Sequence, residues 1–244
     1  PGKTAIENHF DINVELIDNL RETGKEELLR ELAFEREDIE YFYTRQRRQL
    51  GLGHAVLCSE PFVQNQSFVV ALGDSILGLN AQSRVVEKMV EKFESTGAAA
   101  VVVFEQVPRN DVFRYGIAKP KGEIDASDEF FQLDDLIEKP AVDEAPSNLA
   151  VAARYVFCPE IFDYLKKTEP GKGGEIQLTD AIRQMIHDGG LVLGCQLPKT
   201  EHRFDIGNFE SYFKAFVEFA LGDPENGDKL REMLVEMLKI GENR

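Results

Sequence analysis

The sequence has few cysteines and no long apolar run. Its three cysteines, Cys58, Cys158 and Cys195, are scattered and odd in number, and none belongs to a cluster with zinc-ligand spacing. We therefore expect small buried side chains in a reduced, cytoplasmic compartment, and not a disulfide framework. No apolar stretch reaches the ~18 residues that a membrane-spanning helix needs. The first residues lack the charged and apolar pattern of a signal peptide.

Positive charge is also scarce. Lys and Arg number 28 and Asp and Glu number 44 among 244 residues, so the formal net charge is −16. This balance excludes a basic nucleic-acid-binding surface at the level of the whole chain and disfavours an anionic membrane as a partner. The length and the 43% hydrophobic content predict a folded protein with a sizeable core.

Strand-like and helix-like stretches alternate along the chain, which is typical of βαβ units and a largely parallel sheet. We expect strands at residues 39–43, 68–72, 98–104, 151–157 and 191–197. Helices are expected at 12–32 with a break at Gly24, at 84–94, from 160 onward and at 176–187. Residues 115–140 carry Gly and Pro and allow an antiparallel excursion.

The end of the chain differs from the rest. Two helical stretches with apolar faces follow residue 208, and Gly222-Asp223-Pro224 separates them. We predict one α/β domain over residues 1–208 and a helical appendage over 209–244. The apolar faces allow the appendage to close the core or to pair with another subunit.

Two aspartates are candidates for a metal site. Asp74 follows the apolar run 68–72, and ligands bind outside the carboxyl ends of strands in open α/β sheets. Asp205 lies on a second short apolar stretch. Two such carboxylates suit Mg²⁺, which takes few carboxylates plus substrate phosphates. Asp74 alone fits a helix cap or turn equally well, and the sequence does not bring the two residues together.

Glu138 and Lys139 form a second candidate, between an apolar stretch and Pro140. On a strand, adjacent side chains point to opposite faces. One side chain would then hold a sugar hydroxyl and the other a phosphate. An exposed charged turn before the proline is the alternative.

Glycines mark two further segments. Gly51 and Gly53 allow close backbone approach to a ligand, but no third glycine completes a dinucleotide-binding fingerprint, and a turn is the commoner role. The Gly-rich turn at 171–174 opens a helix yet lacks the Walker spacing. Its acidic continuation at Glu175 favours sugar hydroxyls or a structural cap over phosphate.

Taken together and in order, these segments resemble the bacterial UTP–glucose-1-phosphate uridylyltransferases, or UDP-glucose pyrophosphorylases. The resemblance runs over nearly the whole chain and is carried by residues 2–11, 50–58, 145–150 and 174–180. The last two segments are specific to this group. The resemblance implies a Rossmann-like nucleotide-diphospho-sugar transferase domain, with a mostly parallel mixed sheet and C-terminal helices. Together with the apolar faces of the C-terminal helices, it also suggests a homo-oligomer.

The resemblance also implies a reaction and its residues. UMP passes from UTP to glucose 1-phosphate, which gives UDP-glucose and pyrophosphate. Asp74 and Asp205 would hold Mg²⁺, and together with Lys139 they would form the catalytic group. The substrate-binding residues implied are Gln46 and Gly51 at the uracil, Gly116 beside the glucose ring, Glu138 at the sugar hydroxyls, Lys139 at the sugar phosphate, and Glu175 nearby.

Two features depart from the family. The Gly-rich loop with an Arg and a Lys, which follows the family's first strand, has no counterpart here, so we expect an N-terminally incomplete domain. Ala153 stands where the family usually has Gly, and its methyl group is expected to weaken sugar binding. The alternatives are a non-catalytic paralogue that binds a sugar nucleotide as a regulatory or scaffold subunit, and the same reaction with dTTP.

Overall fold

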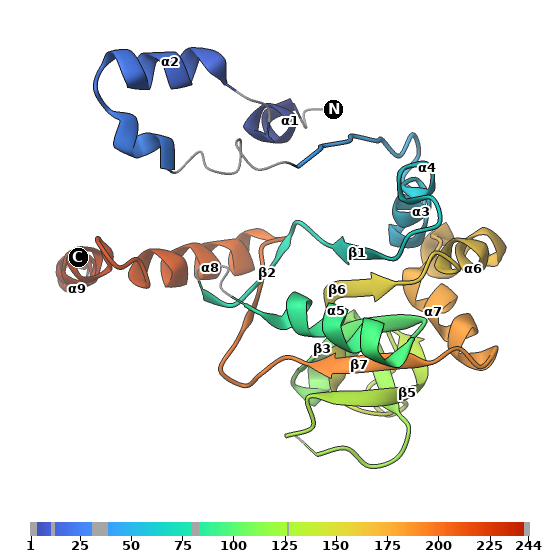
Figure 1. Cartoon of the computed structure of the whole chain (residues 1–244). Coiled ribbons are helices and arrows are strands. Elements are labelled where there is room, and N and C mark those ends of the chain that lie inside the picture. The colour runs from blue at the N-terminus through green and yellow to red at the C-terminus, as the bar shows by residue number, and fades with distance from the viewer. Residues whose placement is uncertain (1–3, 11–12, 31–38, 80–82, 126, 242–244) are drawn as a thin grey trace. The chain divides into compact units, whose positions relative to one another are not determined.

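The computed structural model describes residues 4–10, 13–30, 39–79, 83–125 and 127–241 (Figure 1). Contacts between residues divide the chain into two compact units, Pro1–Arg47 and Arg48–Arg244. The composition along the chain does not predict this division. The separate appendage after residue 208 stays a prediction.

The first unit is helical. It contains α1 (Thr4–Phe10), α2 (Val14–Glu22) and the 3₁₀ helix η1 (Glu26–Arg30). Asn13 caps α2 by accepting a hydrogen bond from the Leu16 N–H at 3.0 Å. The predicted break at Gly24 is confirmed by its left-handed φ of 68°. The ends of the predicted helix, at residues 12 and 31–32, lie outside the described residues.

The strand predicted at residues 39–43 is wrong, because these residues are irregular. Their aromatic side chains favour extended backbone, but a strand also needs a neighbour for its hydrogen bonds. The described part of the first unit holds helices and irregular backbone, and offers no strand to pair with.

The second unit is built on a six-stranded sheet of order β1-β6-β3-β7-β5-β4. The strands are β1 (Phe68–Ala71), β3 (Ala100–Gln106), β4 (Gly116–Pro120), β5 (Phe130–Glu138), β6 (Leu149–Phe157) and β7 (Val192–Gln196). The pairings make β1, β3, β4 and β7 run in one direction, and β5 and β6 in the other. The sheet is therefore mixed, as predicted.

Parallel pairing is rarer than the alternation of elements predicts. Among the described strands, β3 and β7 form the parallel ladder, and the other ladders of this sheet are antiparallel. The reason is the strand order. β6 inserts between β1 and β3, and β5 inserts between β7 and β4, so strands of one direction are mostly not neighbours. The antiparallel excursion predicted at 115–140 is confirmed as the β4–β5 hairpin.

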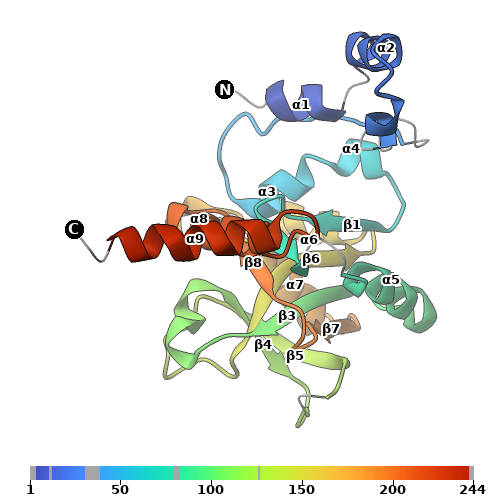
Figure 2. The ribbon, with the colours of Figure 1, turned by 90° about the vertical axis from the view of Figure 1, so that its left-hand side faces the viewer.

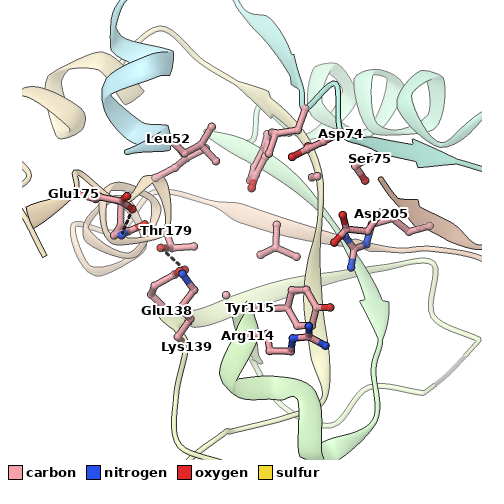
Figure 3. A pocket seen from close by; sticks show the side chains of 18 residues that line it. Leu52, Asp74, Ser75, Arg114, Tyr115, Glu138, Lys139, Glu175, Thr179 and Asp205 are labelled. Atoms are coloured by element: carbon pink, nitrogen blue, oxygen red, sulfur yellow. Dashed lines mark hydrogen bonds and ion pairs between the residues drawn. The ribbon is translucent and has the colours of Figure 1, made fainter. Parts of the chain in front are cut away.

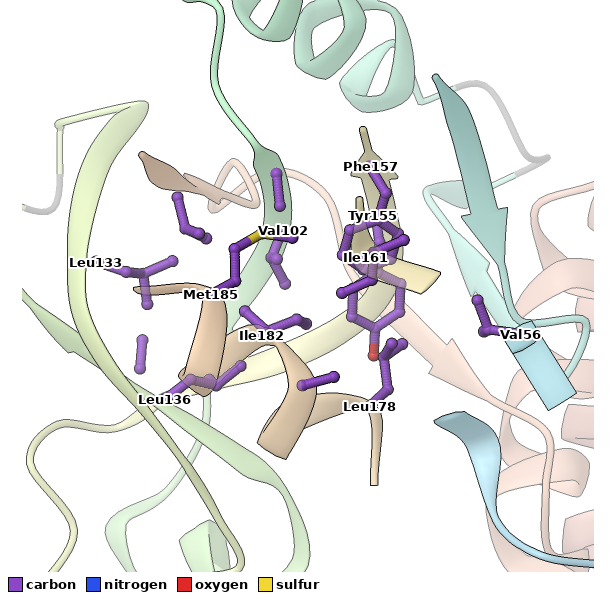
Figure 4. Packing of buried hydrophobic residues seen from close by; sticks show 14 of the residues in the cluster. Val56, Val102, Leu133, Leu136, Tyr155, Phe157, Ile161, Leu178, Ile182 and Met185 are labelled. Carbon is purple, nitrogen blue, oxygen red and sulfur yellow. The ribbon is translucent and has the colours of Figure 1, made fainter. Parts of the chain in front are cut away.

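Strand β3 sends its side chains alternately into two cores, which is the period expected of a strand covered on both faces. Val102 and Phe104 pack with helices α6 (Ile161–Lys167) and α7 (Leu178–His187). Val101 and Val103 pack with α5 (Val85–Thr96). Figure 4 shows Met185 of α7 beside Val102 in the first core. Helices thus cover both faces of the sheet at its centre.

Helices predicted from periodicity match the structure within a few residues. Gly97, with φ of 64°, ends α5, and Gly189, with φ of 91°, follows α7. Cys195 of β7 is buried, and burial raises the pKa of its thiol to about 12, in line with the predicted apolar role.

Several short elements were not predicted. They are helices α1, α3 (Leu52–Leu57) and α4 (Glu60–Val63), 3₁₀ helices η4 (Arg109–Arg114) and η5 (Lys172–Gly174), and strands β2 (Ser75–Leu77) and β8 (Arg203–Asp205). The two strands form a separate antiparallel ladder.

The tail consists of α8 (Phe209–Leu221) and α9 (Gly227–Gly241). α8 runs in the plane of Figure 1 and α9 is seen end-on there, whereas Figure 2 shows α9 from the side, so the two helices cross. Phe219 of α8 packs edge-on against Phe204 of β8, with ring centroids 4.9 Å apart, which ties the tail to the second unit. No helix in the described ranges is both long and apolar enough to cross a bilayer.

Candidate active site

A cavity of about 440 Å³ lies in the second unit, lined by residues at the ends of several strands (Figure 3). It brings together most of the residues proposed from the sequence, namely Asp74, Gly116, Glu138, Lys139, Glu175 and Asp205. Gly51 is adjacent to Leu52, which lines the cavity. Gln46 belongs to the first unit, and its place at a uracil stays a prediction.

Asp74 and Asp205 lie on one side of this cavity (Figure 3). The β2–β8 ladder brings their segments together, since Ser75 pairs with Asp205. The Ile206 N–H donates to the Asp74 carbonyl oxygen at 2.8 Å. A Cβ placed on Gly207 would lie 3.1 Å from Asp205 Oδ1 and 3.7 Å from Asp74 Oδ2. The two carboxylates therefore flank one point, which the sequence alone did not establish.

Ser75, on the same side of the cavity, adds an unusual hydroxyl. The residue is 4% exposed, and its Oγ has no hydrogen-bond partner among the described residues. Such a buried group costs about 1–3 kcal/mol unless something satisfies it. An orphan oxygen beside two carboxylates is typical of a site whose occupant is a cation or a hydrogen-bond donor.

Glu138 and Lys139 lie on the opposite side of the cavity (Figure 3). Glu138 ends β5, and its Oε2 accepts a hydrogen bond from Thr179 Oγ1 at 2.9 Å. Lys139 Nζ is 3.4 Å from Glu138 Oε1. Thr179 at the start of α7 thus fixes the direction of the carboxylate.

The prediction that Glu138 and Lys139 point to opposite faces is wrong, because both line the cavity. Lys139 leaves the strand with a left-handed φ of 46°, and its N–H donates to the Tyr115 carbonyl oxygen at 2.9 Å. This backbone conformation breaks the alternation of a regular strand. It is strained for a residue other than glycine, and such strain is concentrated at functional sites.

Gly116 lies between these groups. A Cβ here would come within 2.7 Å of Thr179 Cγ2 and 3.3 Å of Glu138 Oε2. Any side chain would therefore displace Thr179 or the carboxylate that Thr179 holds. The absence of a side chain at Gly116 keeps this part of the cavity open.

Gly51 and Gly53 allow the backbone of residues 50–53 to lie close to the backbone of residues 175–176. Gly51 has φ of 92°, and a Cβ there would lie 2.7 Å from Glu175 Cβ. The Ile176 N–H donates to the Leu50 carbonyl oxygen at 2.8 Å, and the Gly53 N–H donates to Ile176 O at 2.9 Å. Packing against residues 175–176 thus explains both glycines, and contact of Gly51 with a uracil stays a prediction.

Arg203 also lines the cavity and was not among the site residues predicted from the sequence. Its side chain is 10% exposed, forms an ion pair with Glu105, and lies over the Tyr115 ring at 5.3 Å. Burial raises the pKa of the Glu105 carboxyl, although the charge of Arg203 opposes that shift. Arg203 precedes Asp205 by two residues on β8, and side chains two residues apart on a strand point to the same face. This spacing could have predicted Arg203 from the sequence.

Two other cations of the cavity are more exposed. The side chain of Lys139 is 45% exposed and that of Arg114 is 57% exposed. Because Arg203 is committed to Glu105, these two are the cations most open to an anion among the described residues that line the cavity. One side of the cavity is thus suited to a cation and the other to a phosphorylated, hydroxyl-bearing molecule.

Comparison with known proteins identifies the family. The model of the nucleotidyl transferase family matches residues 10–220. The UTP–glucose-1-phosphate uridylyltransferase 1 of Staphylococcus saprophyticus is 38% identical over 237 residues, which cover 97% of this chain and 78% of that protein. The chain belongs to the nucleotidyl transferase family.

Solved structures of nucleotidyl transferases agree with the fold described above. A UTP-bound UGPase from Acinetobacter baumannii gives a TM-score of 0.82 at 34% identity, over 95% of this chain and 78% of that chain. A UDP-glucose pyrophosphorylase complexed with UDP-glucose gives 0.74 at 31% identity, over 87% and 75%. The predicted mixed α/β nucleotidyltransferase fold is confirmed. Relatives named as enzymes favour catalysis over the non-catalytic alternative.

Proposed function

We propose that this nucleotidyl transferase joins glucose 1-phosphate to the α-phosphorus of UTP, and so forms UDP-glucose and pyrophosphate. The observation that carries the proposal is the single cavity that holds Asp74 and Asp205 on one side and Glu138 and Lys139 on the other. The names of the similar proteins support the choice of substrates.

The chemistry needs positioning more than proton transfer. A phosphate oxygen of glucose 1-phosphate, already an anion, bonds to the α-phosphorus of UTP. The bond from that phosphorus to the bridging oxygen of the β-phosphate breaks, and pyrophosphate leaves with the electron pair. The difficulty is to bring two polyanions together in line, which bound cations and rigid contacts achieve.

The cavity residues fit the sugar phosphate. Glu138 accepts hydrogen bonds from sugar hydroxyls, while its Oε2 also accepts a hydrogen bond from the Thr179 hydroxyl. Lys139, whose side chain is 45% exposed, binds the phosphate with its ammonium group. Gly116 leaves room for the ring, and Glu175 borders it. For the uracil we keep Gln46 and Gly51 as predictions.

Asp74 and Asp205 are the residues that we propose for Mg²⁺. The fit depends on their oxygens, which flank one point, and on the orphan Oγ of Ser75 near them. When bound, Mg²⁺ would neutralise charge on the phosphate oxygens of the nucleotide. Asp74 and Asp205 would place that charge on the side of the cavity opposite Lys139.

The test is pyrophosphate release by the purified chain with UTP, glucose 1-phosphate and Mg²⁺, with each component omitted in turn. We expect release only in the complete mixture, together with formation of UDP-glucose. Replacing UTP by dTTP decides the choice of base. A folded chain that binds UDP-glucose without any turnover would contradict the reaction and favour a non-catalytic paralogue.

We also propose that the enzyme works as a cytoplasmic homo-oligomer. The three cysteines are free thiols, which supports a reducing compartment. Large apolar side chains on α8 and α9 are exposed and support pairing with another subunit.

A further inference from the structure

Strand β6 carries a bulge beside the cavity. Opposite β3, Tyr155 pairs with Val102 and Val151 pairs with Phe104, so the three residues 152–154 lie opposite Val103 alone. Ala153, in the middle of this bulge, has a left-handed φ of 60° and lines the cavity. Bulges of this kind re-aim a side chain and are frequent next to active sites. The residue re-aimed here is Arg154.

The guanidinium of Arg154 holds both ends of the turn that carries Asp74. Its Nη1 donates to the carbonyl oxygens of Leu72 at 3.2 Å and Ala153 at 2.9 Å. Its Nη2 donates to the Ser75 carbonyl oxygen at 2.6 Å. Leu72 and Ser75 are the residues on either side of Gly73-Asp74. One planar group thus fixes the start and the end of this turn.

The bulge makes this arrangement available. Because Ala153 is left-handed, its carbonyl oxygen accepts from both the Leu72 N–H, at 3.2 Å, and Arg154. Arg154 itself does not belong to the residues that line the cavity with Asp74. It is half-buried, and burial lowers its pKa while the charge of Asp74 opposes that shift. With Leu72, Gly73 and Ser75 it lines a neighbouring cavity, and its hydrogen bonds go to the backbone of the turn that carries Asp74 and to Ala153.

We propose that Arg154 is a positioning residue that fixes the Asp74 carboxylate beside Asp205. Without the hydrogen bonds of Arg154 to Leu72 and Ser75, the turn keeps three backbone contacts. They are the Ser75 N–H to the Leu72 carbonyl oxygen at 3.3 Å, the Leu72 N–H to Ala153 at 3.2 Å, and the Ile206 N–H to Asp74 at 2.8 Å. Asp74 would then sample positions away from the point that the two carboxylates flank. The inference rests on the proposed function because it assigns Asp74 to a divalent cation.

The test compares R154K and R154A with the matched control R183K in the full chain. Lysine keeps the positive charge but has no planar fork to span the carbonyls. Arg183 is also a half-buried arginine with two hydrogen bonds, which go to Asp135, and it does not line the cavity. Binding of Mn²⁺ alone is measured by electron paramagnetic resonance, and the Mg²⁺ concentration for half-maximal velocity by steady-state kinetics.

We expect R154A to weaken Mn²⁺ binding and to raise the Mg²⁺ requirement by about 10- to 100-fold, as outer-shell changes do. R154K should lie between R154A and wild type, R183K should match wild type, and the KM for glucose 1-phosphate should change least. Unchanged Mn²⁺ affinity and Mg²⁺ requirement in folded R154A overturn the inference. If R154A does not fold, R154K gives the same decision.

The same measurements distinguish a failure of the positioning role of Arg154 from a failure of the proposed reaction. Suppose that wild type binds Mn²⁺ but forms no UDP-glucose, and that D74N and R154A both lose Mn²⁺ binding. This result would support the positioning role and contradict the reaction alone. Formation of UDP-glucose by wild type, with R154A and R154K indistinguishable from it, would contradict the positioning role alone.

Discussion

Lys139 shows how one backbone angle changes the chemistry of a residue. Its φ of 46° takes it out of the alternation of β5 and places it on the same side of the cavity as Glu138. A sugar hydroxyl and its neighbouring phosphate are close together on glucose 1-phosphate, so two side chains that diverged across a strand would not reach both. In the proposed function, the strained backbone at Lys139 would serve recognition of the phosphorylated sugar.

We predict that K139A raises the KM for glucose 1-phosphate about tenfold or more, and the KM for UTP much less. The reason is that a hydrogen bond to a charged group contributes about 1.5–3 kcal/mol. Steady-state kinetics with each substrate varied in turn measures the difference. K119A is the control, since Lys119 is exposed and paired with Asp134. An equal rise in both KM values would count against the assigned role.

Ala153 is the second residue with an unfavourable backbone angle at the cavity, with φ of 60°. The left-handed conformation costs a residue with a Cβ about 1–2 kcal/mol, whereas glycine costs about 0.5–1 kcal/mol of chain entropy on folding. We predict that A153G raises the free energy of unfolding by about 0.5–1 kcal/mol. Denaturant unfolding measures it.

A152G is the matched control for this prediction. Ala152 is fully buried and is not among the described residues with positive φ, so loss of its methyl group should destabilise the chain. Stabilisation by both changes, or by neither, would show that the backbone at Ala153 is not strained. A153G also removes the methyl group that is expected to weaken sugar binding, so the KM for glucose 1-phosphate should fall.

At the scale of elements, the site depends on how closely β4 meets α7. Gly116 begins β4 and Thr179 lies in the first turn of α7, and the hydroxyl of Thr179 holds Glu138 of β5. Three elements therefore meet at the sugar side of the cavity. Contacts between helix and sheet, and not the individual strand, set the position of the carboxylate.

We predict that G116A destabilises the chain by about 1–3 kcal/mol, because overpacking forces neighbours to move, and that it raises the KM for glucose 1-phosphate. The added Cβ would lie 2.7 Å from Thr179 Cγ2. T179S removes that methyl group and keeps the hydroxyl, so the double variant G116A/T179S should recover much of both losses. Thermal melts and kinetics of the double-mutant cycle measure the recovery. Strictly additive effects would contradict the proposed contact.

At the scale of the whole molecule, the charge of −16 repels both proposed substrates at long range, because each of them is an anion. Screening limits this repulsion to a Debye length of about 8 Å at physiological salt. We therefore expect the cations that line the cavity, Lys139 and Arg114, to decide binding of the proposed substrates. A protein of strongly negative charge can still bind polyanions when cations gather at one place.

The apolar surface of the tail has a different role. Phe209, Phe213 and Phe216 of α8 are 81%, 60% and 62% exposed. Aromatic side chains are enriched at protein–protein interfaces, and large contiguous apolar patches are rare on the surface of a monomer. The exposed aromatic side chains of α8 support the proposed homo-oligomer.

We predict that the double variant F213Q/F216Q lowers the oligomeric state, because it removes the apolar side chains that the partner subunit would cover. Light scattering coupled to size-exclusion chromatography measures the mass of wild type and variant. F113Q is the control, since Phe113 is 53% exposed but lies on η4. A monomeric wild type, or a variant of unchanged mass, would contradict assembly through α8.

The sequence by itself determined features that short local signals specify. The period of apolar residues and a following glycine specify α5 and α7, because burial of one face and a left-handed stop act within a few residues. The apolar runs specify β3 and β7, which are buried, and also β1, although β1 is an antiparallel strand at the edge of the sheet with alternate residues exposed. The family resemblance supplied the site residues, most of which line one cavity. A short aromatic run such as residues 39–43 does not specify a strand by itself, because a strand forms only where a neighbouring strand accepts its hydrogen bonds.

Only the tertiary structure decided which strands are neighbours and how the site is aimed. The order β1-β6-β3-β7-β5-β4 follows from long-range packing, which no local period encodes. The meeting of Asp74 with Asp205 needs the ladder of β2 and β8, each too short to show a period. Lys139 lines the cavity because its own φ is left-handed. Arg154 reaches the turn that carries Asp74 because the φ of Ala153 is left-handed. Those angles are fixed by contacts between residues far apart in the chain, so they exist only once the chain has folded.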